Sequence, residues 1–133
     1  MPQDVHFANV EFELECHLSL TPLLNEIGHM ICIHHHDRRE NGNDFASFDV
    51  EGSGLDWDVD TTISKFCDLV EGLSPEANDI WLGCAKRELD IGFESGDSAR
   101  VYEGRIENKT LARVAKIGAT IEITIYPVDL AGS

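Results

Sequence analysis

The stretch FASFDVEGSGLDWDVD, residues 45–60, alternates apolar and acidic side chains on both sides of a Gly-Ser pair. Alternation predicts half-buried strands, because successive side chains of a strand point to opposite faces of a sheet. The pair Gly52-Ser53 suits the centre of a two-residue type II′ turn. The stretch therefore predicts a β-hairpin in which Val50 faces Leu55.

The same register predicts that two acids of this hairpin oppose each other. Phe48 would face Trp57 on the apolar side, and Asp49 would face Asp56 on the polar side. Two carboxylates directly opposed across a strand pair destabilise a sheet by some tenths of a kcal/mol. Such a hairpin either lies in good solvent or binds a cationic partner, and the sequence leaves both alternatives open.

The segments around the hairpin predict further strands and helices. Residues 10–20 show the cleanest alternation, with apolar residues at even positions and Glu11, Glu13 and Glu15 between them. Residues 30–33 fit either a strand or a buried connector, and residues 34–44 are expected to form a polar loop. Asp60 or Thr61 is expected to cap the helix that follows the hairpin. Helices are predicted over residues 22–27, 61–71, 75–87 and 109–117, and strands over residues 88–94, 101–105 and 119–126.

This order of elements predicts an α+β fold in one domain over residues 1–133. Strands with one apolar and one polar face are typical of a mostly antiparallel sheet whose polar face is in water. We expect four to six strands, with three to four helices packed on one face. The polar face would then carry no Lys or Arg and would gather the following acids: Glu11, Glu13, Glu15, Asp49, Asp56, Asp58, Asp90, Glu94 and Glu122.

The charge of the chain is strongly acidic and uneven. It contains 25 acids and 10 bases, a net charge of −15, and residues 1–60 contribute 13 of those acids against two arginines. Such a chain repels nucleic acid and anionic membranes and attracts basic partners, although acidity also serves solubility alone. No membrane span or signal peptide is visible. The four cysteines lack CxxC spacing, which favours reduced, mostly buried thiols in the cytoplasm over two disulfides in an exported protein.

The sequence offers one candidate metal motif. His34-His35-His36, with Asp37 and Glu40 nearby, carries the donor types that zinc or nickel prefers. Adjacent histidines on a loop cannot all reach one ion without strain, so the sequence favours a solvated loop with no metal or cofactor. There is also no phosphate-binding or nucleophile motif, and the carboxylates lie on faces expected to be exposed. We therefore do not expect an enzyme.

The C-terminal half resembles an uncharacterised bacterial family of small α+β domains. The residues that carry the resemblance are Trp57 before a helix and the closing segment LARVAKIGATIEITIYP at residues 111–127. The resemblance spans residues 55–127 and rests on packing and turn residues. It implies a bacterial origin and, since such small domains are frequently encoded beside toxin genes, a role as an immunity protein.

Charge and resemblance together predict an immunity protein that binds and neutralises a cognate toxin, a basic nuclease, as a monomer or weak dimer. The alternatives are a small-ligand or metal-binding module and an accessory domain without a toxin partner. Carboxylates would take the places of substrate phosphates and pair with basic residues of the toxin. The expected partner-binding residues are Asp49, Glu51, Asp56, Asp58, Glu11, Glu13 and Glu15.

Overall fold

A computed structural model describes residues 3–53 and 57–128 of the chain. In these residues five strands form one sheet with the order β2-β3-β1-β4-β5, accompanied by four α-helices. Neighbouring strands are antiparallel except β4 and β5, which run parallel. The strands are β1 (His6–Cys16), β2 (Ile31–Arg38), β3 (Asp44–Val50), β4 (Cys84–Glu94) and β5 (Thr120–Tyr126). The helices are α1 (Thr21–Ile27), α2 (Val59–Glu71), α3 (Pro75–Gly83) and α4 (Asn108–Lys116), with a short 3₁₀ turn at Gly28–Met30. The predicted α+β class is confirmed.

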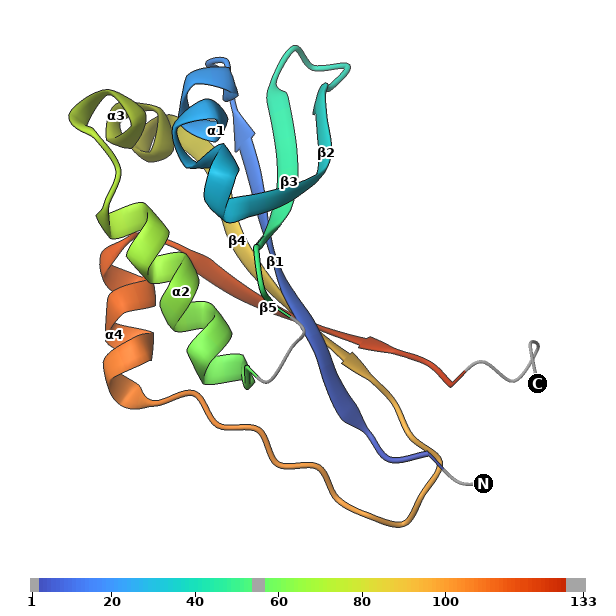
Figure 1. The fold of residues 1–133 in the computed structure, drawn as a ribbon. Helices are drawn as coiled ribbons and strands as arrows, with labels where there is room; N and C mark the ends of the chain where they lie inside the picture. Colours follow the sequence, from blue (N-terminus) through green and yellow to red (C-terminus); the bar gives the residue numbers. More distant parts are fainter. Residues whose placement is uncertain (1–2, 54–56, 129–133) are drawn as a thin grey trace.

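The helices pack on one face of the sheet and leave the opposite face without helical cover (Figure 1). The central strand β1 shows the division most clearly, because its even-numbered residues from Val10 to Cys16 are buried. The glutamates between them are only partly buried. The alternation of residues 10–16 therefore gives the faces that the sequence predicts.

Aromatic side chains form the centre of the core between sheet and helices. The ring of Phe12 on β1 lies 4.8 Å from that of Phe66 on α2 and 5.2 Å from that of Trp81 on α3, both edge-on. Phe48 on β3 completes the group at 5.8 Å from Phe12. The indole N–H of Trp81 donates to the carbonyl oxygen of Ile117 at 2.9 Å, so this buried polar group is satisfied.

Helix α2 begins earlier than the sequence predicts. Its N-cap is Asp58, whose carboxylate accepts a hydrogen bond from the backbone N–H of Thr61 at 2.8 Å. The prediction of a cap at Asp60 or Thr61 is thus wrong by two or three residues, and Val59 is already helical. No helix in the described part of the chain is long and apolar enough to cross a membrane.

The predicted hairpin over residues 45–60 is wrong. Phe48 pairs with Phe12 of β1 on one side and with Ile33 of β2 on the other, so no edge remains for Trp57. Val50 pairs with Ile31. The predicted partners Leu55 and Asp56 lie outside the described residues. Asp58 is a helix cap and Asp60 lies in the first helical turn. Over so few residues, acids at every second position look the same in a strand and at the start of a helix.

The actual hairpin joins β2 and β3. Residues 34–38, predicted as a loop, extend β2, and the turn at residues 39–43 is closed by a hydrogen bond from the N–H of Arg39 to the carbonyl of Asn43 at 2.7 Å. Gly42 in this turn has a φ of 88°, which favours glycine. Strand β2 lies at the edge of the sheet and is exposed along most of its length, so its sequence lacks the apolar alternation of an inner strand.

Strand β4 begins at Cys84, directly after α3, and therefore contains two cations that were predicted to end a helix. Arg87 still contacts helix ends from its place on the strand: its Nη1 donates to the carbonyls of Trp81 and Leu82 at 3.1 and 3.2 Å. Lys86 points to the other face of the sheet. Residues 101–105, predicted as a strand, lie in an irregular connection between β4 and α4.

Candidate interaction site on the open face of the sheet

Carboxylates of four strands gather on the face that the helices leave open. The strand register pairs Glu11 of β1 with Asp90 of β4, and Asp90 with Glu122 of β5. Two residues further along β1, Glu13 pairs with Glu88 of β4. We call this surface the acidic face and define it by Glu11, Glu13, Glu15, Asp49, Glu88, Asp90 and Glu122.

Few cations balance the acidic face. Lys86 lies on it and forms an ion pair with Glu13, with 2.8 Å between Nζ and Oε1. Arg39 lies at its corner, with its guanidinium 3.7 Å from the centre of the Phe45 ring. The prediction that this face carries no Lys or Arg is therefore wrong, because β4 starts early enough to include Lys86. Acids still outnumber bases on it.

The crowding shifts the ionisation of two of these acids. Burial raises the pKa of Glu11, and the negative charges of Glu13, Asp90 and Asp49 raise it further, while His34 acts in the opposite direction. A hydrogen bond shared with Glu122 raises the pKa of Glu88, and burial adds to the effect. A positive charge brought to this face would therefore relieve existing repulsion.

The acidic face contains a shallow depression near β2 and β3. It is lined by Glu11, Glu13, His35, Asp37, Arg39, Phe45 and Ser47. The hydroxyl oxygen of Ser47 is buried and has no hydrogen-bond partner within residues 3–53 and 57–128. The carboxylate of Glu15 accepts from the side-chain amide of Asn43 at 3.0 Å, and this bond lowers its pKa.

The structure places some of the predicted partner-binding residues together on the acidic face and others elsewhere. Glu11, Glu13, Glu15 and Asp49 lie on the acidic face. Asp58 does not, since it caps α2, and its pKa is lowered by the backbone N–H of Thr61. Glu51 is exposed in the turn after β3, and Asp56 lies outside the described residues.

Sequence reasoning missed two elements of this surface for one reason. The sequence predicts a loop for residues 34–38 of β2 and a helix end for the start of β4, and therefore does not place His34 and Lys86 on the acidic face. The dipeptide Asn41-Gly42 is the usual sequence signal for a tight hairpin and could have revealed β2. Glu88 was assigned to a strand but not to the acidic face.

The three consecutive histidines do not converge. His34 lies with its Nε2 3.1 Å from a carboxylate oxygen of Asp49 on the acidic face. His36 is directed to the other side, where its Nε2 lies 3.0 Å from the buried carboxylate of Asp44. The donor atoms of Cys32, His34 and Asp49 instead lie within 4.8 Å of one another. Cys32 is exposed and the other three cysteines are buried, in agreement with the prediction of mostly buried thiols.

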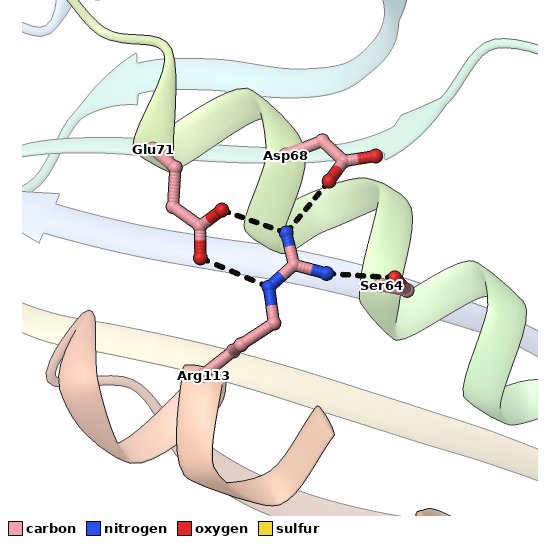
Figure 2. Close-up of polar contacts among 4 residues, drawn as sticks. All are labelled: Ser64, Asp68, Glu71 and Arg113. Atoms are coloured by element: carbon pink, nitrogen blue, oxygen red, sulfur yellow. Dashed lines mark hydrogen bonds and ion pairs between the residues drawn. The ribbon is translucent and has the colours of Figure 1, made fainter. Parts of the chain in front are cut away.

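A second acid cluster lies between α2 and α4 (Figure 2). The guanidinium of Arg113 donates to both carboxylate oxygens of Glu71 at 2.8 and 2.9 Å, to Asp68 at 2.6 Å and to Ser64 at 2.8 Å. These bonds raise the pKa of Arg113 and lower that of Glu71. One guanidinium on α4 thus bridges two carboxylates on α2 and joins the two helices.

The fold and this face define an α+β protein with a one-sided sheet and an exposed acidic surface. Comparisons with protein-family models, with curated proteins and with solved structures found no match. The site itself must therefore support any functional conclusion.

Proposed function

We propose that this chain is an immunity protein that binds a basic toxin, a nuclease, through the acidic face and so neutralises it. The observation that carries the proposal is the absence of helical cover over a sheet face crowded with carboxylates from four strands. A surface that repels itself gains most from a partner that supplies cations. The resemblance of residues 55–127 to small bacterial domains supports the same class of protein.

In this mechanism the chain and the nucleic-acid substrate would compete for the same basic residues of the toxin. Nucleases bind phosphates with Lys, Arg and His, and a row of carboxylates such as Glu11, Asp90 and Glu122 offers the same groups a similar charge. Long-range attraction would accelerate encounter and added salt would slow it. Burial of the matched charges would then slow release.

The test is expression of the protein whose gene neighbours that of this chain, with and without the chain, in a growth assay that first asks whether that protein is toxic. We expect the chain to restore growth. The double variant Asp90→Lys with Glu122→Lys should abolish the rescue, because it reverses two neighbouring charges of the acidic face, on β4 and β5. In purified form, the association rate constant should fall as ionic strength rises.

A matched control separates a docking surface from net charge alone. Asp79→Lys with Glu103→Lys changes the net charge equally at exposed positions on α3 and on the connection before α4. This control should keep the rescue. Equal loss of rescue in both double variants would mean that net charge, and not the position of the acids, determines binding. An association rate constant that does not change with salt would contradict the proposal.

A further inference from the structure

Three donor atoms of different chemistry meet at one end of the acidic face. Cys32 and His34 are two residues apart on β2, next to a register shift between Ile33 and His35, and their donor atoms meet on the acidic face. Asp49 is the register partner of Cys32 on β3. The thiol sulfur, the imidazole nitrogen and a carboxylate oxygen of these residues all lie within 4.8 Å of one another.

A fourth donor is provided by the central strand. The Oε2 atom of Glu11 on β1 lies 3.8 Å from the Nε2 atom of His34, and the same nitrogen lies 3.1 Å from Asp49 Oδ2. Tetrahedral zinc with bonds of about 2.0–2.3 Å holds its ligand atoms about 3.3–3.6 Å apart. The two separations measured from His34 are therefore close to those of a tetrahedral site, whereas Glu11 lies outside the group of donors within 4.8 Å of one another and has to turn toward the ion.

We propose that Cys32, His34, Asp49 and Glu11 form a zinc-binding site. One sulfur, one nitrogen and two carboxylate oxygens make a mixed set that suits zinc and other borderline metals, whereas magnesium and calcium prefer oxygen ligands alone. The donors are held by three neighbouring strands, which fix their relative positions. Cys32 and His34 are exposed, so an ion can reach them from solvent.

This site differs from the metal motif that the sequence suggests. Of the three consecutive histidines it uses His34 alone, because His36 contacts Asp44 on the other face. It also recruits Cys32, which stands two residues before His34, and Glu11, which is distant from both in sequence. The inference does not rest on the proposed immunity function, since it concerns the free chain and an ion.

The test uses the full chain, without an affinity tag and with its thiols kept reduced, and zinc as the only ligand. Calorimetric titration should show one zinc ion per chain. Cys32→Ser and His34→Ala should each weaken binding about tenfold or more. Cobalt(II) in place of zinc should show thiolate-to-cobalt charge-transfer absorption, and Cys32→Ser should remove that absorption.

The matched controls are His35→Ala, on the next residue of the same strand, and His29→Ala, on the exposed 3₁₀ turn. Both should bind zinc as the unchanged chain does. Because Cys32 and His34 are exposed, their variants should fold, and an unchanged thermal midpoint without zinc would verify this. Absence of zinc binding by the unchanged chain, or zinc binding by Cys32→Ser and His34→Ala that is as tight as in the unchanged chain, would overturn the site.

Discussion

Acidic side chains cluster in two regions of this molecule, and the two clusters are treated in opposite ways. Between α2 and α4, Asp68 and Glu71 share the guanidinium of Arg113 (Figure 2). On the acidic face, the shared partner of Glu88 is another acid, Glu122. On the same face Glu13, Glu15 and Asp90 do have partners, namely Lys86, Asn43 and Thr124, so the contrast is sharpest between the carboxylates bound to Arg113 and Glu88. Removal of a matched acid or its partner should therefore cost stability, and removal of an unmatched acid should increase it.

The largest effect is expected at the buried acid Asp44. Its carboxylate accepts from the backbone N–H of Leu20 at 2.7 Å and lies 3.0 Å from His36. Burial alone would raise the pKa of Asp44, but these two partners outweigh burial and lower it. Asp44→Ala leaves the buried N–H of Leu20 without its acceptor, so urea unfolding should show a loss of about 2–3 kcal/mol.

The control for this variant is Asp37→Ala, an exposed aspartate on the adjacent strand. It should change the free energy of unfolding by no more than about 0.5 kcal/mol. Similar losses in both variants would show that Asp44 is not matched in the way the hydrogen bonds indicate.

The next effect is expected at Arg113. Arg113→Ala removes the hydrogen bonds to Ser64, Asp68 and Glu71 and leaves two carboxylates facing each other between the helices. Since both carboxylates are about half exposed, solvent screening limits the loss to about 1 kcal/mol in urea unfolding.

Two variants sharpen this result. Arg113→Lys keeps the charge but not the bidentate geometry and should recover part of the loss. Arg105→Ala, at an exposed position in the connection before α4, should have almost no effect. If Arg105→Ala costs as much as Arg113→Ala, the cluster has no special role in joining the helices.

The sequence predicts the core of this fold better than its sheet register. The alternation of β1 and the stripe of Ile63, Phe66 and Val70 on α2 are local patterns, and both are confirmed by burial. The register of β3 depends on contacts with β1 and β2, which are distant in sequence or lack a local signal. The turn rule applied at Gly52 shows this limit. Gly52 does have a φ of 91°, and the N–H of Ser53 bonds to the carbonyl of Val50, but Trp57 and Asp58, the next described residues, belong to no strand.

The acidic face was predictable where it rests on a single strand. Glu11, Glu13 and Glu15 follow from alternation in β1 alone. The contribution of Asp49 was predicted from a wrong hairpin and is nevertheless on the face, because β3 keeps the same alternation beside β1. The zinc donors could not be predicted, since they come together only through the register of three strands.

The smallest effect, and the one of opposite sign, is expected at Glu88. Its shared hydrogen bond with Glu122 raises its pKa, and its buried Oε1 atom has no hydrogen-bond partner within the described residues. A raised folded-state pKa means that the associated stability is fully present below the unfolded pKa of about 4.3 and is lost as pH rises through the folded value. Glu88→Gln should therefore stabilise the chain at pH 7 by a few tenths to about 1 kcal/mol.

The pH dependence of the stability gained in Glu88→Gln tests this explanation. The difference between Glu88→Gln and the unchanged chain should shrink below pH of about 4, where Glu88 is protonated in both states, and the comparison cancels the effects of other carboxylates. Glu103→Gln, at an exposed position in the connection, should show no gain at either pH. A loss of stability in Glu88→Gln at pH 7 would mean that Lys86 already matches Glu88, and that the two acid clusters of this protein differ less than their geometry indicates.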